Sequence, residues 1–138
     1  MKLPKIHLLF LCLTFGLMAC EEDKTECENV GCTEEFRTIT LELTDQNGEA
    51  VLLDDYHTYL DQYNLFTIDK AVNSGFPQFY PVISDAQMDL LDFEGKVFIF
   101  VGFIDGEVVI EQAFEVAKDC CHIQLIRGET KAQIEVAQ

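Results

Sequence analysis

The 138-residue sequence predicts an antiparallel β-sandwich of seven or eight strands with one short helix. Short segments that alternate apolar and polar residues recur roughly every 8 to 12 residues, with turn-forming residues between them. Residues 97–104 are almost wholly apolar, and this run is too short for an average helix. Asn-Gly at 47–48 and Asp-Gly at 105–106 accept the positive φ angles of tight hairpin turns. These features favour strands joined by turns.

The first strand is expected within residues 36–44, FRTITLELT. Ile39, Leu41 and Leu43 alternate with polar residues there, which is the period-two pattern of a strand with one wet face. The turn at Asn47-Gly48 follows. Residues 50–60 are therefore expected to fold back on the first strand as a second one.

The middle of the chain predicts an edge strand and a helix. Residues 61–78 mix apolar and turn-forming residues and are expected to give a short strand and a loop. Residues 79–84, FYPVIS, include a proline, which lacks a backbone N–H, so this strand is expected at a sheet edge. Ser84 is a good helix N-cap, and Met88 and Leu91 follow at helical spacing, which predicts one short helix.

The strongest core signal lies between residues 97 and 117. The run VFIFVGFI at 97–104 predicts a strand that is buried on both faces. Asp105-Gly106 is expected to join it to residues 107–116 in a hairpin. Residues 120–128 and 130–137 predict two further strands with a turn near Gly128-Glu129.

The N-terminus is typical of a secretory signal. Lys2 and Lys5 precede residues 6–18, which are almost wholly apolar. A helix of this length is about 20 Å long, shorter than the roughly 30 Å hydrocarbon core of a bilayer, so a permanent spanning helix is disfavoured. The motif LMAC at 17–20 resembles the lipobox of bacterial lipoprotein signals. The resemblance implies that residues 1–19 are removed and that Cys20 becomes an acylated first residue; the alternative is an ordinary secretion signal cut elsewhere.

Charge excludes two classes of partner. Removal of Lys2 and Lys5 leaves 7 basic and 25 acidic residues, a net charge of about −18 (7 − 25). Such a surface repels nucleic acid and anionic lipid headgroups, so the membrane link is expected to be the lipid on Cys20. Residues 20–35 predict an acidic tether. Glu21 to Asp23 also resemble the export signal that places lipoproteins on the outer face of the outer membrane in some Gram-negative bacteria, which implies a surface-exposed envelope protein.

Two resemblances bear on the domain at 36–138. Asp45, Gly48 and Val51 form an Asp-x-x-Gly-x-x-Val turn after a strand, as in carboxypeptidase-regulatory and transthyretin-like sandwich domains. This resemblance covers about twenty residues and implies a transthyretin-like or immunoglobulin-like sandwich. The lipid site, the two early cysteines and the late DCCHI motif at 119–123 resemble uncharacterised bacterial lipoproteins of similar size. Neither resemblance supplies an activity, and sandwiches of this kind host binding more often than chemistry.

Four cysteines remain after Cys12 leaves with the signal and Cys20 is acylated. In an oxidising compartment, Cys27, Cys32, Cys120 and Cys121 are expected to form two disulfides. A bond between the adjacent Cys120 and Cys121 is excluded, because their Cα atoms lie about 3.8 Å apart against the usual 4.4–6.8 Å. Cys27 with Cys120 and Cys32 with Cys121, or Cys27 with Cys121 and Cys32 with Cys120, both remain. Either pairing joins the tether to a late strand.

The alternative use of these thiols is a zinc site with His122. A Cys-x4-Cys pair followed by two adjacent cysteines does not match a common zinc motif. Alternation in a strand at 121–126 also places Cys121, Ile123 and Leu125 on one face and His122 and Gln124 on the other. We therefore expect disulfides, with no metal and no cofactor.

Other polar or aromatic clusters are interpreted structurally. They are His57 beside Asp54 and Asp55, taken as an exposed strand residue; Asp45, Asn47 and Gly48, taken as a hairpin turn in preference to a calcium loop; Asp85, Asp89, Asp92 and Glu94, taken as a solvated face; and Phe76, Phe79 and Tyr80, taken as core in preference to a sticky rim.

No known catalytic motif accompanies these residues. The sequence therefore predicts a lipid-anchored, non-enzymatic binding or accessory module of the cell envelope. Two alternatives remain: an enzyme or metal-handling protein that uses His122 and the nearby cysteines, and a structural envelope protein without a ligand.

Overall fold

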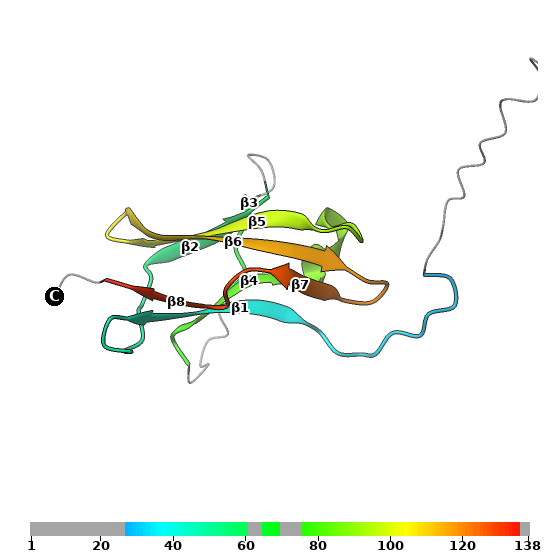
Figure 1. Cartoon of the computed structure of the whole chain (residues 1–138), viewed down its shortest axis with the longest axis horizontal. Helices are drawn as coiled ribbons and strands as arrows, with labels where there is room; N and C mark the ends of the chain where they lie inside the picture. Colours follow the sequence, from blue (N-terminus) through cyan, green and yellow to red (C-terminus); the bar gives the residue numbers. More distant parts are fainter. Residues whose placement is uncertain (1–26, 61–64, 70–75, 136–138) are drawn as a thin grey trace, which may run out of the picture.

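Two β-sheets lie face to face in the structure, a computed structural model that describes residues 27–60, 65–69 and 76–135 (Figure 1). A three-stranded sheet has the order β4-β1-β8, and a five-stranded sheet has the order β3-β2-β5-β6-β7. The predicted signal, Cys20 and parts of the loop at 61–78 lie outside the described residues. The elements are β1 (Thr38–Asp45), β2 (Asp55–Tyr59), β3 (Leu65–Phe66), β4 (Phe79–Ser84), the 3-10 helix η1 (Asp85–Leu90), β5 (Lys96–Ile104), β6 (Glu107–Lys118), β7 (Ile123–Arg127) and β8 (Lys131–Ile134).

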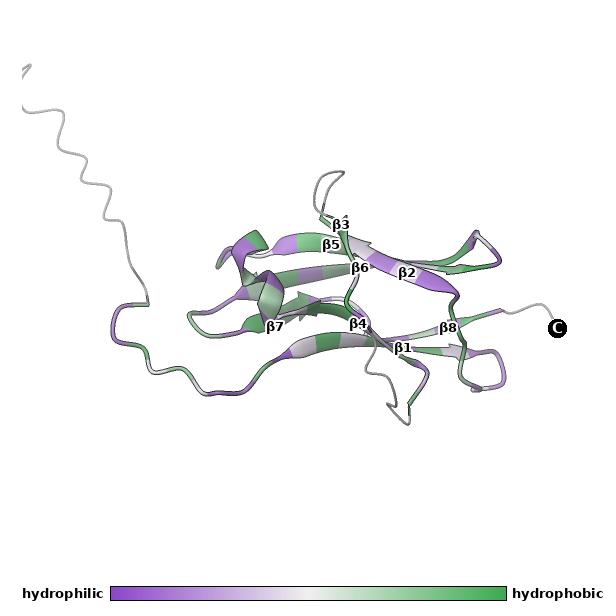
Figure 2. Cartoon of the chain, turned by 180° about the vertical axis from the view of Figure 1, so that it is seen from behind, coloured by the Kyte–Doolittle hydropathy of each residue, from purple (hydrophilic) through white to green (hydrophobic). Residues whose placement is uncertain are grey.

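The core fills the space between the sheets, because the inward residues of each strand are apolar. Leu41 and Leu43 of β1 face Phe98 and Phe100 of β5, and Phe114 of β6 completes the layer; all five are fully buried. Figure 2 shows hydrophobic bands along the strands, alternating with hydrophilic ones. The predicted sandwich with one short helix is confirmed.

The predicted β5–β6 hairpin is confirmed. Its strands pair from Lys96↔Val116 to Ile104↔Glu107. Asp105 and Gly106 have φ angles of 52° and 79°, the left-handed values that a two-residue hairpin turn requires. This hairpin forms the centre of the five-stranded sheet.

β4 lies at a sheet edge, as its proline predicts. Ser84 ends β4 and caps η1. Its hydroxyl accepts from the N–H of Ala86, and the Gln87 side-chain oxygen accepts from the N–H of Ser84. The predicted short helix is thus present as a 3-10 helix. It places Asp85 in its first turn.

The prediction that residues 50–60 pair back on the first strand is wrong beyond a single bridge, Thr44↔Ala50. The chain instead crosses to the other sheet, where β2 pairs with β5. The Tyr80 hydroxyl makes this crossing favourable, because it donates to the carbonyl of Val51 and accepts from the N–H of Leu53, both at 2.8 Å. The Leu53 side chain then lies over Gly102, which has no Cβ to obstruct it.

The sandwich is not wholly antiparallel, since β8 pairs in parallel with β1 from Glu42↔Lys131 to Asp45↔Ile134. After β7 the chain changes sheets at Gly128, which has a φ of 136°. A Cβ at Gly128 would lie 2.9 Å from the carbonyl oxygen of Ala113, so only glycine fits this close crossing. The crossing brings β8 in along the free edge of β1 in the same direction.

The prediction that residues 97–104 are buried on both faces is also wrong. Phe98 and Phe100 point into the core. On the opposite face Val97 is 51% exposed, and Ile99 and Phe103 are half-buried, whereas Val101 is only 5% exposed between its neighbours on β2 and β6.

Candidate functional site: the clamped N-terminal segment

Two disulfides join the segment before β1 to the turn before β7. Cys27 is bonded to Cys120 and Cys32 to Cys121, with Cα–Cα distances of 5.2 and 5.3 Å. This is one of the two pairings that the sequence leaves open. Each bond closes a loop of about ninety residues, 93 and 89 in sequence separation. We call residues 27–37 the clamped segment, because they are held at one end of the sandwich (Figure 1).

Asp119 holds the turn that contains Cys120 and Cys121, the second cysteines of the two disulfides. One oxygen of its carboxylate, Oδ1, accepts from the backbone N–H groups of Cys121 and His122, both at 2.7 Å. The other, Oδ2, accepts from the Gln124 amide at 2.6 Å. The hydrogen bonds from the Cys121 and His122 backbones lower the pKa of Asp119 below its usual value. The carboxylate is therefore charged at neutral pH and fixes the turn.

A line of three polar side chains runs from η1 through the turn before β7 to the clamped segment. The Nδ1 atom of His122 lies 2.9 Å from Oδ2 of Asp85, and its Nε2 atom lies 3.0 Å from Oγ1 of Thr33. Because a carboxylate only accepts, Nδ1 carries a proton, and in the neutral ring Nε2 accepts from the Thr33 hydroxyl. His122 is only 6% exposed, so both ring nitrogens are satisfied in a largely dry setting.

Asp85 is the centre of this network. Its carboxylate also accepts from the backbone N–H groups of Arg37 and Ile123, both at 2.8 Å, so it ties the clamped segment to β7. Burial raises the pKa of Asp85, but the hydrogen bonds from Arg37, Ile123 and His122 outweigh burial and leave the pKa below its usual value. One charged carboxylate thus satisfies three donors from two distant parts of the chain, residue 37 and residues 122–123.

The predicted alternation at 121–126 is wrong at its start. β7 begins only at Ile123, because Asp119 holds residues 120–122 in a turn. Ile123 is buried and Gln124 exposed, as predicted, but His122 is buried and Leu125 is partly exposed, against the prediction. The sequence argument that separated His122 from its neighbours therefore does not apply.

The clusters around His57 and Asp45 agree with their structural interpretations. His57 is on the outer face of β2, with its ring 5.3 Å from that of Phe103, and no hydrogen bond joins it to Asp54 or Asp55 in the described part of the chain. Asp45 caps its own turn by accepting from the N–H groups of Asn47 and Glu49. Those hydrogen bonds, the one from Glu49 first, lower the pKa of Asp45.

The interpretations of the acidic and aromatic clusters are each wrong in part, since Asp85 is not on a solvated face and Phe76 is not in the core. Asp85 belongs to the His122 network, whereas Asp92 accepts from the N–H of Gly95 and pairs with Lys96. Tyr80 is buried in the core, whereas Phe76 is exposed and only its contact with the Phe79 ring, at 5.9 Å between centroids, shields it. Residues 27–60, 65–69 and 76–135 contain no group of three or more His, Cys, Asp or Glu side chains arranged to hold a metal ion.

Sequence reasoning missed Thr33 and the role of Asp85. Thr33 carries no local signal, since its partner His122 is 89 residues away. Asp85 carries only a weak signal, because an acid in the first turn of a helix is already favoured by the helix dipole. Asp119 was detectable, since an aspartate two residues before a turn N–H commonly accepts from it.

A shallow depression lies at the opposite end of the sandwich. It has a volume of about 240 Å³ and is lined by Asp45, Ala50, Val51, Leu52 and Ile104. Within the described residues, no helix has the length and apolar character needed to cross a bilayer. Comparisons of the chain with protein-family models, curated proteins and solved structures find no match.

Proposed function

We propose that the chain is a lipid-anchored binding or accessory module of the bacterial cell envelope, attached through Cys20 and displayed on the outer membrane. The observation that carries this proposal is the clamped segment. Two disulfides and the Thr33–His122–Asp85 line fix the chain from Cys27 onward to one end of the sandwich. Force applied at the N-terminus is therefore carried by the two disulfides and not by the hydrogen bonds of an edge strand.

The distance between lipid and domain follows from the sequence. Cys27 lies seven residue steps after Cys20, and a fully extended chain spans at most about 3.6 Å per step, or roughly 25 Å in total. In Figure 1 the clamped segment lies at the end opposite the β5–β6 turn and the end of β8. A short anchor at one end keeps the domain near the membrane while its sheet faces stay accessible. This arrangement suits a module whose task is to bind.

The anchor is tested by metabolic labelling with a palmitate analogue in cells that express the full chain. We expect label in the membrane fraction that the Cys20→Ala variant loses. Cys12→Ala is the matched control, because Cys12 lies within the same N-terminal region but outside the lipobox. Label that survives in Cys20→Ala, or a native protein that begins at Met1, would overturn the proposed anchor.

Surface placement is tested separately. Protease added to intact cells should digest the wild-type domain, and Glu21→Gln, Glu22→Gln and Asp23→Asn together should protect it by retaining it on the inner side. Equal digestion of wild type and variant would show that these acids do not direct placement.

A second candidate function is acyl-ester hydrolysis, favoured by the hydroxyl–imidazole–carboxylate line. In this case Thr33 Oγ1 attacks an ester carbonyl, His122 Nε2 takes the hydroxyl proton and returns it to the leaving alcohol, and water later releases the acyl group. Asp85 would hold the ring through Nδ1. Thr33 is exposed on the clamped segment, so an ester can reach it.

A chromogenic acetate ester separates the two candidates. The hydrolase predicts turnover that Thr33→Ser keeps and that Thr33→Val and His122→Gln lose, with the acyl group found on residue 33 by mass spectrometry. Equal hydrolysis by wild type and Thr33→Val would refute it. The line of side chains would then be a structural part of the clamp alone.

A further inference from the structure

The outer face of the five-stranded sheet has an unusual composition. In an antiparallel sheet with one face in water, outward residues are normally polar. On β5, however, all four outward residues are apolar: Val97, Ile99, Val101 and Phe103. We call them the apolar column. It runs along the central strand of the sheet for about 20 Å, as six residue steps of roughly 3.4 Å.

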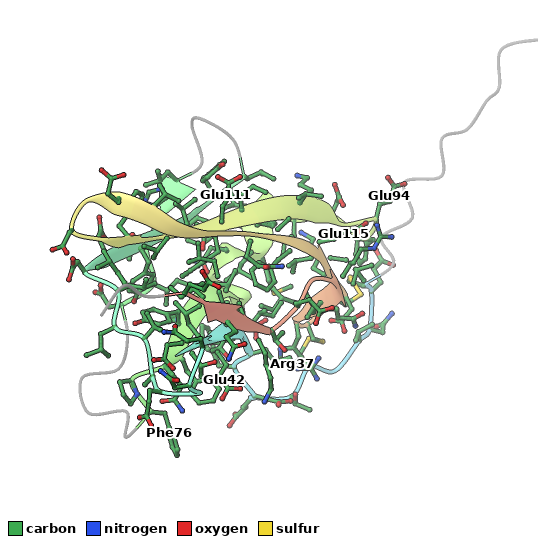
Figure 3. All side chains as sticks on the ribbon, turned by 60° about the vertical axis from the view of Figure 1, so that its left-hand side comes forward. Arg37, Glu42, Phe76, Glu94, Glu111 and Glu115 are labelled. Carbon is green, nitrogen blue, oxygen red and sulfur yellow. A yellow bond between two sulfur atoms is a disulfide. The ribbon has the colours of Figure 1, made fainter. Side chains whose placement is uncertain are left out.

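The strand register places different side chains on the two flanks of this column. His57 and Tyr59 of β2 stand opposite Val101 and Ile99, and their rings lie 6.3 Å apart. On the other side, Glu111 and Glu115 of β6 stand opposite Val101 and Val97. Figure 3 shows the two glutamates on β6, on the other side of the molecule from Glu42 and Phe76. The column therefore has an aromatic flank and an acidic flank.

The ends of the column are open. Val97 is 51% exposed, and Val108, opposite Phe103, is 55% exposed. Leu65, opposite Tyr59 on the aromatic flank, is 59% exposed. Between these ends Ile99 and Phe103 are half-buried and Val101 is only 5% exposed, so a partner would contact mainly the ends and flanks of the column. A contiguous set of apolar side chains with exposed members marks an interaction surface more often than scattered single residues do.

Charge selects the occupant. Glu111 is exposed and has no ion pair among the described residues, while Glu115 pairs with the exposed Arg127 at 3.6 Å. The chain as a whole carries a net charge of −16. A second copy would bring the same acids together, and an anionic lipid surface would be repelled. A partner with a basic border beside an apolar stripe meets neither penalty.

We propose that the outer face of the five-stranded sheet docks a cationic amphipathic segment of another protein, with apolar residues on the column and Lys or Arg beside Glu111 and Glu115. This proposal gives the partner chemistry for the binding role proposed above. It does not depend on the lipid at Cys20, so a failed labelling experiment leaves it standing.

The test uses a peptide of leucine and lysine at helical spacing as the probe, about 18 residues long so that a helix of roughly 27 Å covers the column. A leucine and glutamate peptide of the same pattern is the control probe. Binding to the folded, oxidised domain is measured by fluorescence anisotropy at two salt concentrations. We expect binding of the lysine peptide only, weakened by salt.

Matched variants locate the site. Glu111→Lys with Glu115→Lys should weaken binding of the lysine peptide at least about tenfold, whereas Glu49→Lys with Glu129→Lys, the same charge change on exposed turns, should change it less than about twofold. Val97→Thr with Val108→Thr, which keeps β-branched side chains in the strands, should also weaken it, whereas Val30→Thr, the same change at an exposed valine of the clamped segment, should not. Equal losses in the two glutamate pairs, binding of the glutamate peptide, or no binding of either peptide would overturn the proposal.

Discussion

At the scale of single residues, Asp85 and Gly102 are positions where distant segments of the chain meet. Asp85 accepts hydrogen bonds from the backbone of Arg37 and, far along the sequence, from the His122 ring and the Ile123 backbone. Gly102 is the place where the crossing chain approaches the five-stranded sheet most closely. A small substitution at either position therefore tests these contacts.

Asp85→Asn should destabilise the domain by about 1.5–3 kcal/mol, because the new amide group donates where a carboxylate accepted. Urea unfolding at neutral pH measures the loss. Asp89→Asn is the control, since Asp89 is an exposed acid of the same helix. An equal effect of the two substitutions would contradict the role assigned to Asp85.

The pH dependence of stability follows from the same carboxylates. The pKa of Asp85 and that of Asp119 are lower in the folded protein, so folding gains stability that is fully present above the ordinary carboxyl pKa of about 4. This stability is lost as the pH falls through the lower folded values. We expect the free energy of unfolding to decline below about pH 4 in the wild type, and to decline less steeply in Asp85→Asn.

Gly102→Ala should cost about 1–3 kcal/mol through overpacking. A Cβ there would lie 2.5 Å from Leu53 Cδ1 and 2.9 Å from Ile110 Cγ2, inside the core. Gly31→Ala is the control, because a Cβ at Gly31 meets nothing within 4 Å. Thermal unfolding of both variants measures the difference, and equal melting temperatures would contradict the close approach.

At the scale of elements, local patterns predicted what local forces decide. The β5–β6 hairpin follows from Asp105-Gly106 and its flanking strands, the edge position of β4 from its proline, and η1 from the Ser84 cap. The crossing after Ala50 was missed, because it depends on the hydroxyl of Tyr80, a residue about thirty positions away. The parallel β1–β8 pair was missed because it joins strands about ninety residues apart in the sequence and depends on the change of sheet at Gly128.

Gly106→Ala tests the hairpin. The positive φ of 79° costs an alanine about 1–2 kcal/mol, so the variant should unfold at lower urea concentration with an unchanged slope. Since a Cβ at this position meets no atom within 4 Å, the loss is conformational and not steric. Stability equal to that of the wild type would mean that the turn is not of this type.

At the scale of the whole molecule, the two disulfides fix the clamped segment to the sandwich. That Cys27, Cys32, Cys120 and Cys121 are all paired was predicted from the sequence, but which cysteine pairs with which, and the Thr33–His122–Asp85 line, were not. Adjacent cysteines have no pattern that distinguishes their partners, and buried hydrogen bonds between distant residues leave no periodic signal. The outer face was predicted as core for a related reason, since an apolar strand looks the same whether its second face is covered or open.

Removal of the disulfides should be strongly non-additive. The two loops share nearly all their residues, so either bond alone closes most of the chain. Cys27→Ser with Cys120→Ser should therefore cost little, whereas loss of all four cysteines should cost about 4–5 kcal/mol. Urea unfolding of the single-pair and double-pair variants measures both. Additive losses would show that each bond acts on a separate part of the structure.

The most direct test of the clamped, anchored domain is mass spectrometry of the native protein, purified from membranes, digested without reduction and fragmented by electron transfer. We predict a first residue Cys20 that carries acyl chains, with Cys27 linked to Cys120 and Cys32 linked to Cys121. Free thiols at these four positions, the exchanged pairing, or an unmodified Met1 would contradict the account.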